Sequence, residues 1–290
     1  MSSHTLLDAW LIEHSPKRLL QAALCNALQN VVTGWPKSLD FATLSLSDLQ
    51  VTVAGHWQYE SAIAQQLAAR LPADTRMLGP QLAAEITAWS APAAPVTIAT
   101  GLKATVNSAG RLTFTLSSEG RQAWLQHWLQ SPWPEMLLVP ETPPAHSESC
   151  AGEWPLCDRL QLSLPMLLQW ADVRCQRWQA DWSPNTKPPV IVIPETAPQR
   201  VDVMLTFLLP TVMRGLDQLA NDSSAAKTGK RVGYCLAVRV YELEARLAGW
   251  RSPRAGEPAT VSRWAALMAT QKALQLILAM TFRQGPCRSL

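Results

Sequence analysis

Arginine, lysine and tyrosine side chains in the last 130 residues have the types and spacing that could bind a polyanion. They are Arg174, Arg177, Lys230, Arg231, Arg239, Tyr241 and Arg246. Residues three or seven apart share one side of a helix, which groups Arg174 with Arg177 and Arg239 with Arg246. Guanidinium groups pair bidentately with phosphates, and aromatic rings stack on unpaired bases. We therefore predict an RNA- or partner-binding surface on these residues.

The same residues also have an ordinary structural interpretation. Asp172 and Glu242 lie close in sequence to these arginines and could neutralise them in salt bridges. Tyr241 stands in an apolar helical pattern, where a tyrosine is often a core residue with its hydroxyl at the edge. Three tryptophans, Trp124, Trp128 and Trp133, are predicted to serve packing. Both interpretations of the basic residues stay open at this point.

Charge is distributed unevenly along the 290 residues, although the net charge is only +3. Residues 1–131 hold 8 Lys and Arg against 8 Asp and Glu, and residues 132–159 hold 1 against 5. Residues 160–290 hold 16 Lys and Arg against 9 Asp and Glu. The C-terminal part is therefore the part that could meet a polyanion, unless it is simply an arginine-rich solvated surface.

No pattern of residues predicts catalysis. The five histidines are isolated, the six cysteines form no C-x-x-C pair, and no glycine-rich phosphate loop occurs. Glu85 and Glu119 have no partner carboxylate for acid–base chemistry. We expect no enzyme activity, no cofactor and no metal site. The absence of a long apolar run or a signal pattern predicts a cytoplasmic protein without a membrane span.

Residues 1–130 read as a compact α+β domain. Helices are predicted over 5–32, with Ser15 capping a second helix that starts at Pro16, and over 59–71, 80–89 and 119–129. Strands are predicted within 38–54, 96–106 and 112–116.

The remaining residues divide into a linker and a helical domain. Six prolines in 131–159 remove backbone donors, which predicts a proline-rich acidic linker over 131–162 without regular elements. Apolar periodicity predicts helices over 164–181, 200–221, 229–250 and 259–282. Residues 163–290 are therefore predicted to form an all-α helical bundle.

Two segments of the C-terminal half resemble a known RNA-binding domain. Leu168-Gln169-Trp170-Ala171-Asp172-Val173-Arg174-Cys175 is similar to the stretch that opens the helical anticodon-binding (DALR) domain of arginyl-tRNA synthetases. Leu236-Ala237-Val238-Arg239-Val240-Tyr241-Glu242-Leu243 resembles a later helix of that domain, and Gly285-Pro286-Cys287-Arg288 resembles its terminus. The resemblance implies a DALR-type bundle that binds tRNA.

The N-terminal half resembles the N-terminal domain of the same family. Residues 59–68 are similar to a family helix that begins Tyr-Gln-Ser-Asn, with Ala62 in place of the asparagine. Residues 110–116 are similar to a family strand, with Thr113 in place of another asparagine. The family's catalytic H-x-G-H and K-M-S-K motifs are missing, and about 30 residues separate the two halves, too few for a nucleotide-binding domain.

The resemblance therefore implies a synthetase-like protein without the catalytic domain. Its function would be binding of tRNA or structured RNA through the basic helical domain. The alternative is a protein-interaction, regulatory or assembly module in which the former tRNA surface docks a protein complex. The replaced residues, the modest charge and the acidic linker favour this alternative.

Overall fold

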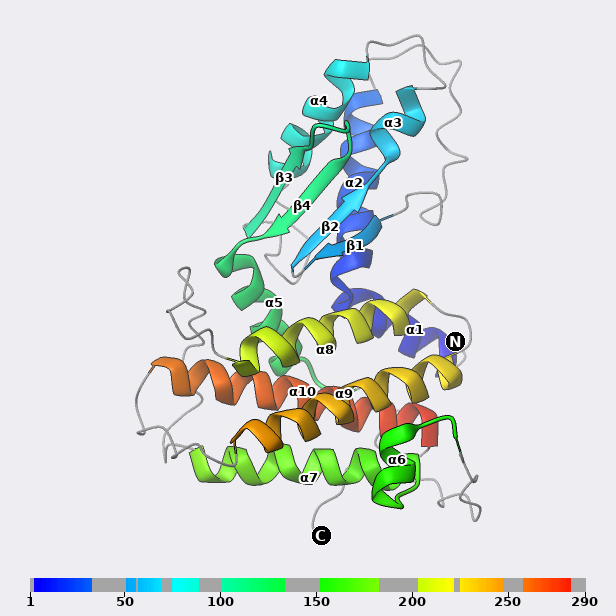
Figure 1. Cartoon of the computed structure of the whole chain (residues 1–290). Helices are drawn as coiled ribbons and strands as arrows, with labels where there is room; N and C mark the ends of the chain where they lie inside the picture. The colour runs from blue at the N-terminus through cyan, green and yellow to red at the C-terminus, as the bar shows by residue number, and fades with distance from the viewer. Residues whose placement is uncertain are drawn as a thin grey trace. The chain divides into compact units, whose positions relative to one another are not determined.

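The computed structural model separates the chain into two compact units, shown in Figure 1. Residues Ile12–His127 form the first, here the sheet unit, and residues Met1–Leu11 with Trp128–Leu290 form the second, the helical unit. The structure describes residues 3–32, 51–55, 57–68, 75–88, 101–133, 152–182, 203–221, 225–247 and 258–282. Predictions for residues 38–50 and 96–100 lie outside these ranges.

A four-stranded antiparallel sheet forms one layer of the sheet unit, in the order β1-β2-β4-β3. Its strands are β1 (Val51–Gly55), β2 (Gln58–Ser61), β3 (Leu102–Val106) and β4 (Leu112–Leu116). In β4, Leu112, Phe114 and Leu116 are fully buried while the two threonines between them are half-buried. This alternation places one face of the sheet against the core.

Helices cover that apolar face. The helices α2 (Pro16–Val32) and α4 (Thr75–Ala88) pack on each other, α2 also on β1 and α4 on β3, and α3 (Ile63–Ala68) packs on α4. The backbone N–H of Arg18 donates to Ser15 Oγ at 3.2 Å, so the predicted N-cap of α2 is confirmed. The preceding helix α1 (Ser3–His14) ends immediately before this cap.

The helix predicted over residues 59–71 was partly wrong. Residues 59–61 belong to strand β2, α3 is helical, and residues 69–71 lie outside the described part of the chain. Tyr59 lies opposite Val53 on one side and Phe114 on the other, so this segment forms the interior of the sheet. Tyr59 and Ser61 are buried and Glu60 between them is half-buried. Pairing on both sides outweighs the helical tendency of so short a segment.

The start predicted for the next helix was also wrong. Helix α4 begins at Thr75, and Pro80 lies inside it. Proline removes one hydrogen bond from a helix interior. Leu78, Leu82 and Ile86, spaced by four residues, are at most 1% exposed and hold the helix to the core on both sides of the proline.

The helical unit is a bundle of long helices around α10 (Pro258–Phe282). The helices α7 (Leu164–Trp182), α8 (Val203–Asn221) and α9 (Ala225–Leu247) all pack against α10, and α9 also packs against α7 and α8. Gly233 permits this close approach, because a Cβ there would lie 2.7 Å from Leu168 Cδ2 and 3.0 Å from Ile277 Cγ2. The chain thus combines antiparallel sheet and helices in one unit with a helical bundle in the other.

One described helix, Arg263–Phe282 within α10, is long and apolar enough to cross a membrane by length and composition alone. Its apolar window is 56% buried inside the structure, and Ala265, Leu274 and Ile277 are fully buried. A central helix of a bundle has this character because neighbouring helices surround it. The helix is compatible with the predicted absence of a membrane span.

The predicted linker contains a regular element. A short helix, α6 (Pro155–Leu160), lies within it, so the expectation of no regular structure was wrong there. Its proline stands in the first turn, where the backbone N–H has no acceptor within the helix anyway. Gln161 ends the helix in the left-handed conformation, with φ of 53°.

Candidate functional site

Four side chains of the helical unit form a continuous series of aromatic rings and guanidinium groups, here called the ladder. Its members in order are Arg159, Tyr241, Trp170 and Arg174. The Arg159 guanidinium lies 5.9 Å from the Tyr241 ring centroid, and the rings of Tyr241 and Trp170 lie 6.0 Å apart with a tilt of 52°. The Arg174 guanidinium lies over the Trp170 ring at 5.8 Å. Every step falls within the range of a cation–π or aromatic contact.

Three helices supply the ladder. Arg159 lies on α6, Trp170 and Arg174 lie on α7, and Tyr241 lies on α9. The spacing of four residues places Trp170 and Arg174 on one face of α7. All of them lie at the surface: Arg159 is exposed, and the other three side chains are half-buried. The ladder is therefore accessible to a ligand.

A second tyrosine of α9 holds α6 in place. The backbone N–H of Leu156 donates to the hydroxyl oxygen of Tyr234 at 3.0 Å. The ring of Trp154, directly before α6, lies 4.9 Å from that of Tyr234. Tyr234 precedes Tyr241 by seven residues, so both point toward α6 from one face of α9. This docking is what brings Arg159 to Tyr241.

A carboxylate fixes the far end of the ladder. Arg174 Nη2 lies 2.7 Å from Glu244 Oε1, which links α7 to α9. The two side chains are 33% and 32% exposed, so solvent and salt reach the pair. Ion pairs of this kind typically contribute at most about 1 kcal/mol. Arg174 is thus positioned between an aromatic ring and a carboxylate, but only weakly held.

The structure brings together two of the predicted site residues, Arg174 and Tyr241. Arg239 lies elsewhere: its Nη1 donates to Glu242 Oε2 at 2.6 Å on the same helix, so the predicted salt bridge with Glu242 is confirmed. Residues two apart on a helix do not face each other, so Arg239 and Tyr241 lie on different sides of α9.

Three further predicted residues, Arg177, Lys230 and Arg231, are not part of the ladder contacts. Arg177 and Arg231 are exposed, and Lys230 is half-buried. Arg177 follows Arg174 by three residues, which places it on the same face of α7. Arg246 belongs to α9, but its side chain lies outside the part of the chain that the structure describes.

Among the described residues, Asp172 does not form the salt bridge that its sequence position suggested. Its side chain is fully buried, and Oδ1 accepts a hydrogen bond from Gln275 Nε2 at 3.1 Å. Oδ2 has no partner among the described residues. Burial raises the pKa of Asp172, and hydrogen bonds from Gln271 and Gln275 oppose part of that rise. The hydrogen bond to Gln275 places the carboxyl group between α7 and α10.

A second cation–tryptophan contact of the helical unit is buried. Lys272 on α10 is 8% exposed, and its ammonium lies 5.2 Å from the Trp128 ring centroid and 5.6 Å from that of Trp133. It donates to the carbonyl oxygens of Trp128 at 2.6 Å and of Ser131, at the end of α5 (Ser118–Gln130). Carbonyl oxygens at a helix C-terminus have no N–H donor within the helix, so Lys272 caps the end of α5.

The packing roles predicted for tryptophan are confirmed inside both units. Trp124 and Trp128 are fully buried. Trp128 Nε1 donates to Ala269 O at 3.2 Å in the helical unit, and Trp124 Nε1 donates to His14 O at 3.0 Å in the sheet unit.

Burial lowers the pKa of Lys272 to about 8, so the ammonium beside Trp128 is still protonated at pH 7.

Sequence reasoning missed three residues of the site: Arg159, Trp170 and Glu244. The spacing of four between Trp170 and Arg174 on a predicted helix was a usable signal. Arg159 had none, because it lies in the segment predicted as a linker and meets a residue 82 positions later. The pair of Arg174 with Glu244 likewise joins two separate helices.

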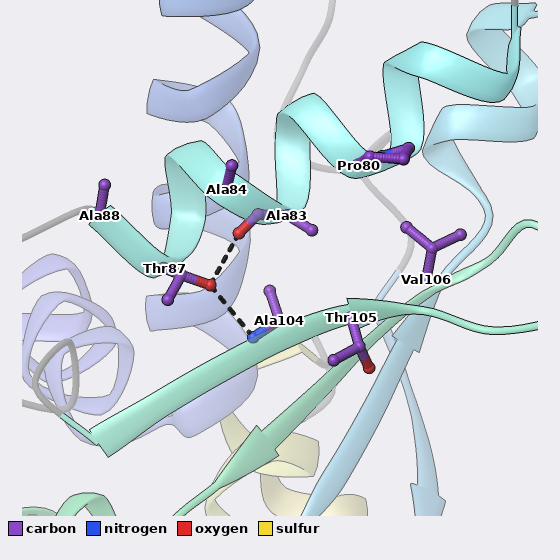
Figure 2. Close-up of a pocket in the computed structure, with 8 residues that line it drawn as sticks. All are labelled: Pro80, Ala83, Ala84, Thr87, Ala88, Ala104, Thr105 and Val106. Atoms are coloured by element: carbon purple, nitrogen blue, oxygen red, sulfur yellow. Dashed lines mark hydrogen bonds between the residues drawn. The ribbon is translucent and has the colours of Figure 1, made fainter.

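The sheet unit has a shallow, open groove with a volume of about 620 Å³. Figure 2 shows it between α4 and β3, with Thr87 of α4 hydrogen-bonded to Ala104 of β3. Thr87 Oγ1 donates to Ala83 O at 2.7 Å and accepts from the backbone N–H of Ala104 at 3.4 Å. The lining is small and uncharged, so the groove offers a ligand few polar contacts.

No protein family model, curated protein or solved structure matches this chain. Within the described residues, no three His, Cys, Asp or Glu side chains come together as metal ligands would. The functional argument therefore depends on the ladder and its surroundings.

Proposed function

We propose that this protein is a non-catalytic, cytoplasmic RNA-binding protein that holds an unpaired segment of tRNA or another structured RNA on the ladder. The observation that supports this most is the pair of adjoining rings of Tyr241 and Trp170, with the guanidinium of Arg159 at one end and that of Arg174 at the other, on an accessible surface. Proteins recognise unpaired RNA by stacking bases on aromatic rings and arginine planes, and by pairing phosphates with arginine.

The ring geometry limits how a base could bind. Two aromatic rings in direct contact have their centroids about 4.5–7 Å apart. The Tyr241 and Trp170 centroids are 6.0 Å apart and the rings are tilted by 52°, so no base fits between them. A base would instead stack on an outer face of the pair, where Arg159 and Arg174 now lie over the rings.

The resemblance to arginyl-tRNA synthetases adds support from an independent direction. The two helical segments that resemble the DALR domain, residues 168–175 and 236–243, supply Trp170, Arg174 and Tyr241 to the ladder. We propose on this basis that the helical unit is a DALR-type bundle and the sheet unit is related to the family's N-terminal domain. Arginine tRNA is then the first RNA to test.

A filter-binding titration of total and arginine-accepting tRNA at low and physiological salt tests the proposal. Each phosphate contact on a single strand contributes about −0.7 to the slope of log K against log salt. We expect measurable binding, with a slope at least as steep as two phosphate contacts produce, one for each ladder arginine. Absence of binding at low salt would refute the proposal.

One observation favours a protein partner as the second candidate. Arg174 and Arg239 are each paired with a glutamate, which lowers the positive charge that the surface offers to RNA. Tryptophan and arginine are frequent anchors of protein interfaces. If tRNA does not bind, affinity capture with the wild-type chain and with Trp170→Ala should identify a protein that only the wild type retains.

A further inference from the structure

The two aromatic rings of the ladder are not free to receive a base as they stand. Arg174 lies over the Trp170 ring at 5.8 Å, and Arg159 lies over the Tyr241 ring at 5.9 Å. A base and a guanidinium cannot occupy the same ring face at the same time. Any base that stacks on that face of Trp170 must therefore displace Arg174.

Glu244 is the group that resists this displacement. Its Oε1 lies 2.7 Å from Arg174 Nη2, across the interface between α7 and α9. Arg159 differs, because among the described residues no carboxylate pairs with it. The pair of Arg174 and Glu244 is half-buried and weak, so Arg174 can exchange Glu244 for another anion, and a phosphate offers the guanidinium a bidentate partner.

We propose that Glu244 latches Arg174 over the Trp170 ring, and that an RNA phosphate takes Arg174 from Glu244 and thereby uncovers the ring for the adjacent base. This inference rests on the proposed RNA-binding function and adds its regulation. The latch makes phosphate pairing and base stacking a single coupled event. It favours a ligand that presents a phosphate next to an unpaired base over a simple anion.

A double-mutant cycle with total tRNA as the probe tests the latch. Glu244→Gln removes the competing charge, so we expect tRNA binding to tighten about two- to five-fold, the range of a surface ion pair. In the Arg174→Gln background the same change should have no effect, because the group that Glu244 competes for is gone. Glu244→Ala should act in the same direction as Glu244→Gln, and thermal melting checks that each variant is folded.

Glu242→Gln is the matched control, because it removes the same charge two residues away from a pair with Arg239 on another side of α9. We expect it to change tRNA affinity less than Glu244→Gln does. Weaker binding by Glu244→Gln, an equal gain in the Arg174→Gln background, or an equal gain from Glu242→Gln would each overturn the latch. If neither the wild type nor Glu244→Gln binds tRNA, the proposed function itself is refuted.

Discussion

Two tryptophans of the helical unit each carry a cation over the ring, and comparing them separates structure from function. Lys272 lies over Trp128 in the interior, where its ammonium also donates to carbonyl oxygens at the end of α5. Arg174 lies over Trp170 at the surface, where its other partner is the half-exposed Glu244. The same kind of contact, a cation over a tryptophan ring, is therefore saturated and buried in one place and exchangeable in the other.

Burial and hydrogen-bond saturation account for the difference. The Lys272 ammonium satisfies helix-end carbonyls that would otherwise be buried without donors. The Arg174 guanidinium retains donors that an incoming phosphate could use. We therefore expect substitutions around Lys272 to change the free energy of unfolding, and substitutions around Arg174 to change ligand binding.

The largest expected effect is on stability at the buried contact. Lys272→Met keeps much of the side-chain volume but leaves the carbonyl oxygens of Trp128 and Ser131 without their donor. We expect the free energy of unfolding to fall by about 2–4 kcal/mol, measured by urea titration. An unchanged unfolding midpoint would show that the buried contact is not structural and would break the comparison.

The next effect is on binding at the surface contact. Trp170→Ala removes the stacking ring, so we expect tRNA affinity to fall by about 1–3 kcal/mol, roughly 5- to 150-fold in Kd. Trp133→Ala is the matched control, because Trp133 also lies under a cation and is half-buried, but beside Lys272. Equal losses of tRNA affinity in the two variants would contradict the assignment of function to the ladder.

A smaller effect is expected from the buried carboxyl group of Asp172. Its pKa is raised by burial, so its contribution to stability is present below the ordinary pKa of about 3.9 and is lost as pH rises through the raised value. Asp172→Asn should therefore be more stable than the wild type at pH 7, by about 1 kcal/mol. Unfolding free energies measured from pH 3 to pH 8 should diverge; parallel curves would contradict the prediction.

The smallest effect is expected at Arg239. This residue matches Arg174 in type, in its half-buried position and in having a glutamate partner, but it lies on another side of α9 from Tyr241. Arg239→Gln should weaken tRNA binding less than two-fold. Arg174→Gln should weaken it more, because this change removes a charge-assisted hydrogen bond to the RNA phosphate. A tRNA-binding titration of the two variants shows on which side of α9 the binding site lies.

Local patterns predicted most of the helices because each one repeats its apolar residues at helical spacing. The N-cap at Ser15 could be predicted from the neighbouring Pro16 alone. The apolar spacing within each segment was likewise enough to predict the helices α7, α8, α9 and α10. Tyr59–Ser61 could not be predicted in this way. Its structure depends on pairing with β4, whose residues lie more than 50 positions later. The same limit hid α6, whose docking depends on Tyr234.

The candidate site was predictable only in part, for the same reason. Arg174 and Tyr241 stood out by residue type, and Trp170 could have been added from its spacing to Arg174. Arg159 and Glu244 enter the site through contacts between helices, which the sequence does not record. Asp172 looked like a partner for arginine, but helix periodicity places it on the buried side of α7.

Photocrosslinking of a 4-thiouridine-substituted tRNA to the wild-type chain, followed by mass spectrometry of the attached peptides, tests the central claim most directly. The account predicts crosslinks on residues 164–182 and on the part of α9 around Tyr241, both lost in Trp170→Ala. Crosslinks confined to the sheet unit or to the Arg239 side of α9 would contradict it, and so would the absence of crosslinks at low salt.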